Sequence, residues 1–253
     1  EKYEAAPTFQ AAVDAAISRI LRLKLALYGS PFRLSVVQPN LETPGEQIKP
    51  AQNQTTLAAI GRDAVTLLSP PSPDLVPDPP TPDDDIVIFT EGRQGQPCAT
   101  CAPVSYIDPQ ILQETILRLY GPSATGQINP RRIASFTFGQ LEEYLNAPPP
   151  RPTPTPTGEE ESTPTPIPPT PIEMALRNAD WIIFAMLNPH ADPPQSAVVR
   201  RFLAERADTL RGPRLVVLAY DAPYYLDATE ISKLRAYYVT YSRIVPFVEA
   251  AEG

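Results

Sequence analysis

The chain has 253 residues, of which 42% are hydrophobic, and its formal net charge is −8. This apolar fraction is enough to bury a sizeable core, whereas the negative charge argues against a surface that follows nucleic-acid phosphates. No apolar run reaches the ~18 to 20 residues that span a bilayer, so neither a nucleic-acid partner nor a membrane span is expected.

Residues 13–29, VDAAISRILRLKLALYG, predict a helix with a wide apolar face that ends at Gly29. Because such a face would otherwise meet water, we expect a partner to pack on residues 13–28. Residues 30–50 carry four prolines and no sustained period, which predicts a connector.

Residues 51–146 then alternate between helix and strand patterns. QTTLAAIGRDAV predicts a helix, TLLS a strand end, and DIVIFT at 85–90 a strand buried on both faces. DPQILQETILRLYG predicts a helix with Asp108 as N-cap, Pro109 at its first position and Gly121 at its end. A further short strand and helix are expected in RIASFTFGQLEEYLNA.

Residues 147–172 are a Pro/Thr-rich segment that favours extended geometry and predicts an insertion or linker. The alternation resumes over 173–253, with helices in MALRNA, SAVVRRFLAERADTL and ISKLRAYYVTYS and buried strands in DWIIFAML and RLVVLAY. Apolar strands that alternate with helices predict an α/β fold, with a mainly parallel sheet covered by helices on both faces.

Several stretches, taken in order, resemble the second domain of glycoside hydrolase family 3, which includes β-glucosidases and β-N-acetylhexosaminidases. They are LAAIGRDAVTLLS, NADWIIFAML, RLVVLAYDAPYYL and YYVTYSRIVPFVEAAEG. Residues 1–29 look like the last helix of that family's catalytic barrel. The barrel itself, with its strand-end Asp nucleophile and Lys-His pair, has no counterpart in the chain, and the Pro/Thr insertion departs from the family pattern.

The resemblance implies an accessory α/β domain of an exported family 3-type enzyme acting on β-linked sugars, inactive by itself because the nucleophile lies on a missing barrel. The implied partners are that barrel, or another polypeptide, on residues 13–28, and carbohydrate. The alternative is a non-catalytic structural or adhesive protein of the cell surface or of a filament, since fold does not imply function.

Retaining glycoside hydrolysis needs two carboxyl groups, and in β-glucosidase-like members the resemblance implies that the second domain supplies the acid/base Glu. Glu91 follows the strand DIVIFT, where ligands of open α/β sheets bind, and is the position for that role. Arg93 and His190 lie in loops of the same kind and are candidates for substrate contact. The competing interpretation, which the residue types favour, is an exposed loop carboxylate for Glu91, a solvated or acid-paired arginine for Arg93 and a surface side chain for His190.

Cys98 and Cys101 are the only cysteines. A disulfide is favoured over a redox dithiol, which prefers a helix N-terminus, and over half of a zinc site, which lacks a second ligand pair. A disulfide suits an extracellular or cell-envelope location. The acidic runs Asp83–Asp85 and Glu159–Glu161 lack the spacing of a calcium loop, so neither metal nor cofactor is expected.

Overall fold

The computed structural model describes residues 2–29, 33, 51–147, 169–188, 195–207, 210 and 212–252. By its internal contacts the chain divides into two compact units, Glu1–Gln54 and Thr55–Gly253. Nearly all of the predicted connector 30–50 and most of the predicted insertion 147–172 lie outside the described residues. Both assignments therefore stay predictions.

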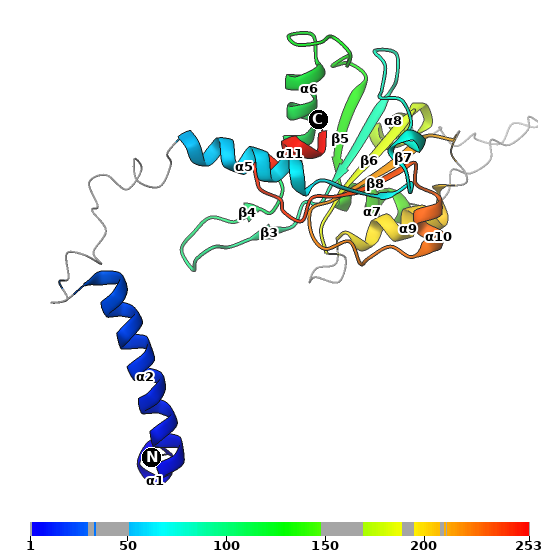
Figure 1. Cartoon of the computed structure of the whole chain (residues 1–253). Helices are drawn as coiled ribbons and strands as arrows, with labels where there is room; N and C mark the ends of the chain where they lie inside the picture. The colour runs from blue at the N-terminus through cyan, green and yellow to red at the C-terminus, as the bar shows by residue number, and fades with distance from the viewer. Residues whose placement is uncertain are drawn as a thin grey trace, which may run out of the picture. The chain divides into compact units, whose positions relative to one another are not determined.

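The first unit contains α1 (Lys2–Ala5) and α2 (Pro7–Tyr28), which Figure 1 colours blue. Gly29 ends α2 with a positive φ of 76°, and its N–H donates to the Leu25 carbonyl at 2.9 Å, as the sequence predicted. No residue of α2 is buried. None of the helices in the described ranges is long and apolar enough to cross a membrane.

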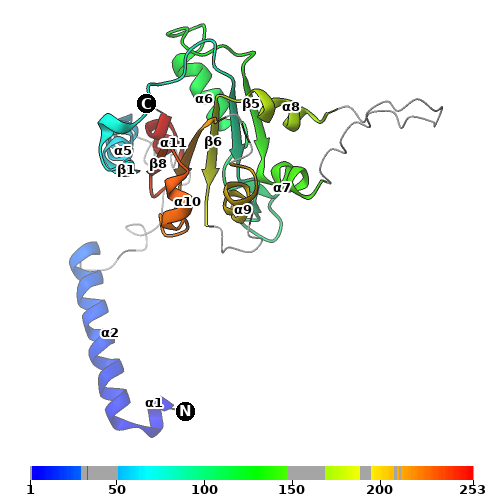
Figure 2. The same cartoon turned by 90° about the vertical axis from the view of Figure 1, so that its right-hand side faces the viewer.

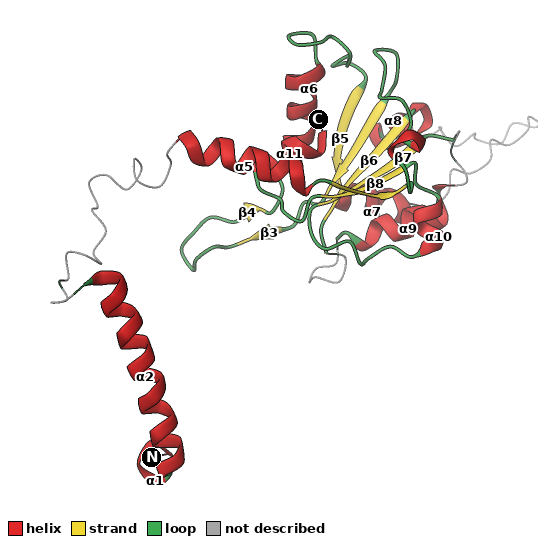
Figure 3. Cartoon of the chain, viewed as in Figure 1, coloured by secondary structure: helices red, strands yellow, loops and turns green. Residues whose placement is uncertain are grey.

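The second unit, with α5 crossing the boundary, holds the other elements that Figure 3 distinguishes by colour. Its helices are α5 (Ala51–Ala64), the 3-10 helix η1 (Pro73–Leu75), α6 (Ile111–Tyr120), α7 (Phe138–Asn146), α8 (Pro171–Asn178), α9 (Ala197–Glu205), α10 (Ala228–Ser232) and α11 (Val245–Glu252). Its strands are β1 (Thr66–Ser69), β2 (Ile86–Thr90), β3 (Gln94–Gly95), β4 (Val104–Ser105), β5 (Ile133–Thr137), β6 (Trp181–Met186), β7 (Arg214–Ala219) and β8 (Ala236–Val239).

Six of these strands form one sheet in the order β1-β8-β7-β6-β2-β5. All neighbouring pairs are parallel except β1 and β8, which confirms the predicted mainly parallel sheet. The central pairing runs from Ile86 opposite Trp181 to Thr90 opposite Ala185. Every residue of β2 is buried, as the continuous apolar run of DIVIFT predicted.

Helices cover both faces of the sheet, because alternate side chains of each buried strand point in opposite directions. On one face, Phe89, Phe184 and Phe202 pack with side chains of α7, α8 and α9. On the other, Ile88 and Trp181 pack with α6 and α11. Figures 1 and 2 show these two helical layers on opposite sides of the strands, which agrees with the predicted α/β sandwich.

The predicted helix over ISKLRAYYVTYS is wrong. Ile231 and Ser232, the first two residues of this stretch, are the last two of α10. Ala236–Val239 form β8, which pairs with β7 on one side and β1 on the other. The run AYYV combines aromatic and β-branched residues, which suit a pleated strand. Tyr237 is completely buried there, so tertiary packing has overridden the helical spacing.

The helix predicted from Asp108 begins later, at Ile111, although it ends at Gly121 as predicted. The Asp108 carboxylate accepts the N–H of Gln110 at 2.9 Å. This is the contact of a short turn, in which an Asp side chain bonds the backbone two residues on. Asp108 therefore closes the turn before α6 and does not cap the helix.

Candidate functional site

The strand order reverses next to β2. From β2 the chain passes through α6 to β5 on one side, then crosses back through α7 and α8 to β6 on the other. The connections that leave β2 and β6 thus run in opposite directions, and open α/β sheets bind ligands at the carboxyl ends of such strands. Glu91 directly follows β2, and Leu187 directly follows β6.

Glu91 is fully buried at this point, so the expectation of an exposed loop carboxylate is wrong. Its carboxylate Oε1 lies 2.7 Å from Nη2 of Arg93, which is only 8% exposed. Oε2 accepts a hydrogen bond from the hydroxyl of buried Ser196 and lies 3.3 Å from the Leu187 N–H. That N–H also donates to Ser196 Oγ at 2.9 Å. Four polar groups from the residues that follow β2 and β6 and from the start of α9 therefore contact one another inside the fold, although Nε of Arg93 is buried without a hydrogen-bond partner.

Burial raises the pKa of the Glu91 carboxyl, because desolvation disfavours the charged form more than the Ser196 hydroxyl and the Arg93 guanidinium favour it. A raised pKa suits a group that must hold a proton before giving it to a leaving group. The carboxyl nevertheless has no surface open to a substrate in this structure. Its predicted acid/base role stays a prediction that requires the cluster to open.

Arg93 also contacts an aromatic side chain. Its guanidinium lies 5.2 Å from the ring centroid of Tyr106, and the guanidinium of Arg243 lies 4.0 Å from the same centroid. We call Glu91, Arg93, Tyr106, Ser196 and Arg243 the Glu91 cluster. Contact between Arg93 and a sugar stays a prediction, because in this structure the guanidinium forms its ion pair with Glu91 and its aromatic contact with Tyr106.

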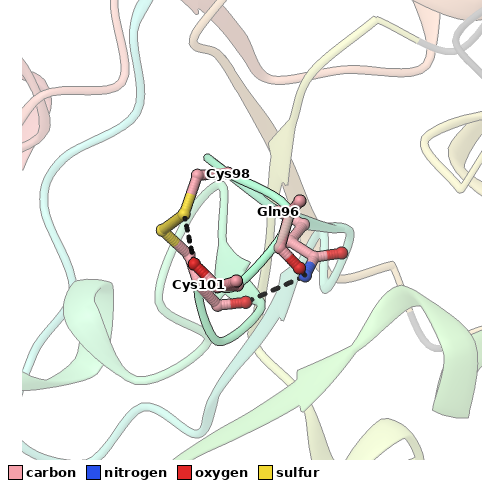
Figure 4. The surroundings of a disulfide bond; sticks show 5 residues. Gln96, Cys98 and Cys101 are labelled. Carbon is pink, nitrogen blue, oxygen red and sulfur yellow. Dashed lines mark hydrogen bonds between the residues drawn. A yellow bond between two sulfur atoms is a disulfide. The ribbon is translucent and has the colours of Figure 1, made fainter.

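The cysteine pair lies in the hairpin formed by β3 and β4. The Sγ atoms of Cys98 and Cys101 are 2.10 Å apart, the distance of a disulfide bond. Gln96 Nε2 donates to the carbonyls of Ala99 and Cys101 at 3.2 and 3.0 Å, and Figure 4 shows this side chain beside the bridge. The pair thus closes a loop, in line with the favoured interpretation of the sequence.

His190 lies outside the described residues, so its expected substrate contact stays a prediction. In the part of the chain that the structure describes, no three His, Cys, Asp or Glu side chains gather where they could hold a metal ion. In the acidic run, Asp85 pairs with Arg132 at 2.9 Å and Asp84 accepts the Thr81 N–H at 2.7 Å.

Sequence reasoning missed three members of the cluster, namely Ser196, Tyr106 and Arg243. Ser196 precedes α9 and has the pattern of an N-cap, yet its side chain makes no cap bond and turns to Glu91. Tyr106 and Arg243 are separated by 137 positions in the sequence, and only the fold brings them together. The signal that could have pointed to Ser196 is its place in the connection from β6 to α9, which begins at the same carboxyl edge of the sheet as Glu91.

No protein-family model and no curated protein matches the sequence. Among solved structures, the chain is similar to a glycoside hydrolase family 3 β-N-acetylglucosaminidase from Paenibacillus sp. str. FPU-7, with a TM-score of 0.51 and 13% identity. This chain has the fold of a family 3 segment. The similarity covers 95% of this chain and 36% of the enzyme, so the chain spans about a third of its length.

Two further matches each cover 86% of the chain. One is a fungal multi-domain family 3 β-N-acetylglucosaminidase, with a TM-score of 0.44, 19% identity and 19% of that chain covered. The other is a β-glucoside phosphorylase, with a TM-score of 0.45, 16% identity and 31% of that chain covered.

Proposed function

We propose that the chain is the accessory α/β domain of an exported family 3-type glycoside hydrolase that acts on β-linked sugars. In this proposal the catalytic nucleophile lies on a barrel domain outside the chain. The observation that carries the proposal is the fold similarity that covers 95% of this chain but only 36% of a family 3 enzyme. The family-like sequence stretches support it independently.

The apolar surface of α2 supports the same proposal. Side chains along the helix, including Ile20 and Leu21, are about half exposed, and none is buried. Many large apolar side chains exposed on one helix indicate an interaction site. The barrel domain is the partner that we assign to residues 13–28.

The site chemistry agrees with an accessory role. A retaining mechanism needs a nucleophile and an acid/base about 5 to 5.5 Å apart. The carboxyl of Glu91 is occupied by Arg93 and Ser196, so the chain alone cannot present it to a glycosidic bond. Export is supported by the Cys98–Cys101 pair, because disulfides persist in oxidising compartments.

An activity assay tests the proposal. The purified 253-residue chain should not hydrolyse aryl β-glucosides or aryl β-N-acetylglucosaminides, whereas a polypeptide that also carries the barrel should. A barrel variant whose strand-end Asp is replaced by Asn controls for contaminating enzymes. Hydrolysis by the 253-residue chain would refute the assignment of the nucleophile to the barrel.

A non-catalytic structural or adhesive protein is the second candidate. The observation that favours it is the burial of Glu91 and Arg93, which makes them fit a structural role. The sequence upstream of Glu1 separates the candidates. A barrel with a strand-end Asp supports the enzyme, and a barrel without one supports the structural protein.

A further inference from the structure

The β3–β4 hairpin forms an arm at the carboxyl edge of the sheet. The arm comprises residues 94–105 and extends away from the six-stranded sheet in Figure 3. Its outer residues Gln96–Thr100 are exposed, and Val104 is 57% exposed. None of these side chains contributes to either core, so the packing of the domain does not explain the arm.

The arm is nevertheless held in one shape. Gln94 pairs with Ser105 and Gly95 with Val104, and the cysteine pair closes the tip. Tyr106 lies directly against Gly95, where a Cβ atom would come within 2.8 Å of the Tyr106 hydroxyl. Only glycine therefore allows the ring this close to the strand.

The base of the arm is fixed by the Glu91 cluster. Arg93 reaches from the Tyr106 ring to the Glu91 carboxylate, which Ser196 holds at the start of α9. An element whose conformation is already fixed loses little entropy when it binds a partner. The buried ion pair thus gives the exposed arm a defined position.

A second loop meets the arm at its base. Arg243, in the loop between β8 and α11, lies over the Tyr106 ring. In the same loop Tyr241 has a positive φ of 59° and is 54% exposed, and Ile244 is 47% exposed. A bulky residue with positive φ is strained, and such strain is concentrated at functional sites. Exposed Tyr, Arg and aliphatic side chains together match the composition of protein interfaces.

We propose that the arm and residues 240–244 form one docking surface for the catalytic barrel domain. The inference rests on the proposed function and adds a second contact to that of α2. The barrel is favoured because the surface lies at the sheet edge where open α/β sheets bind ligands, and because most of the matched enzyme lies outside this chain. A second copy is disfavoured by the net charge of −8 on each chain.

Hydrogen exchange tests the proposal on two preparations, the 253-residue chain and a polypeptide that joins it to the barrel. Residues 94–105 and 240–244 should exchange more slowly in the joined protein. Protection of residues 13–28 reports on the proposed function separately. Protection of 13–28 without protection of the arm would overturn this inference and leave the proposed function standing. Protection of neither would overturn both.

A charge substitution gives a second measurement, with the barrel supplied as a separate polypeptide. Val104→Asp places a carboxylate on an exposed side chain and leaves the contacts within the arm intact. It should raise the Kd for the barrel about tenfold or more. Leu75→Asp is the matched control, because Leu75 is 64% exposed in η1, away from this edge, and should leave the Kd unchanged.

Equal affinities for the Val104→Asp variant and the unmodified chain would contradict the docking surface. Sedimentation of the 253-residue chain at increasing concentration tests whether a second copy of the chain binds to this surface. Arm protection that appears with dimer formation, in the absence of barrel, would show that a second copy binds there and would also overturn the proposal.

Discussion

The Glu91 carboxyl is buried together with a guanidinium, a hydroxyl and a backbone N–H. Its pKa is raised because desolvation outweighs these favourable partners. In the unfolded chain the same carboxyl titrates at about pH 4. The folded protein therefore binds this proton more tightly than the unfolded chain does.

The pH dependence of stability follows from this difference. The contribution of Glu91 is fully present below about pH 4 and is lost as pH rises through the folded pKa. Glu91→Gln removes the titration, so the stability of the wild type relative to this variant should fall as pH rises. Urea unfolding at several pH values from about 4 to 7 measures the trend.

Glu142→Gln, on the exposed side of α7, provides the baseline for losing one carboxylate. A wild type that gains stability over Glu91→Gln with rising pH would show that the ion pair with Arg93 outweighs burial. The sign of the slope thus decides which effect dominates at this residue.

Helix α5 lies unusually close to the start of α11. A Cβ atom on buried Gly61 would lie 2.7 Å from the carbonyl oxygen of Pro246, closer than real Cβ contacts. Gly61→Ala should therefore destabilise the domain by about 1 to 3 kcal/mol, despite the better helix propensity of alanine. Chemical denaturation reports the change.

Gly139→Ala in α7 is the matched substitution. Its Cβ would meet only the Thr137 hydroxyl, at 3.7 Å, so alanine should stabilise by up to about 1 kcal/mol. If Gly61→Ala stabilised to the same extent, α5 would not pack on α11 in this way.

The sequence predicted elements best where local and tertiary preferences agree. IVIF within DIVIFT and WIIFAM are continuous apolar runs and form buried central strands, and Gly29 and Gly121 end helices as expected. AYYV was mistaken for helix because its strand is decided by pairing with β7 and with β1, and β1 lies far away in the sequence, at Thr66–Ser69. The Glu91 cluster was predicted only in part for the same reason, since Tyr106, Ser196 and Arg243 reach it through the fold.

At the scale of the whole molecule, the two units differ in what they bury. No residue of α2 is buried, whereas α11 buries Val248 and pairs Glu249 with Arg118 of α6. A truncated protein of residues 51–253 should therefore have an unfolding free energy within about 0.5 kcal/mol of that of the full chain. It should also be more soluble than the full chain. Urea unfolding and the concentration at which the protein precipitates measure the two effects.

Removal of residues 245–253 is the comparison, because it takes away the α11 contacts and should destabilise the domain by about 2 kcal/mol or more. A loss of similar size on removal of residues 1–50 would mean that α2 serves the α/β unit itself. The apolar side chains of α2 would then pack on the α/β unit and not on another domain.

The strand order also determines what a cut in the chain would do. Residues 51–147 supply β1, β2 and β5, whereas residues 169–252 supply β6, β7 and β8. In the sheet, the second group lies between β1 and β2 of the first, through the β1–β8 and β2–β6 pairings. Two fragments separated within residues 148–168 would each lack the neighbours that their strands need, and each would supply them to the other. The domain is thus divided by its sequence into complementary halves, which hold each other in the sheet through the β1–β8 and β2–β6 pairings.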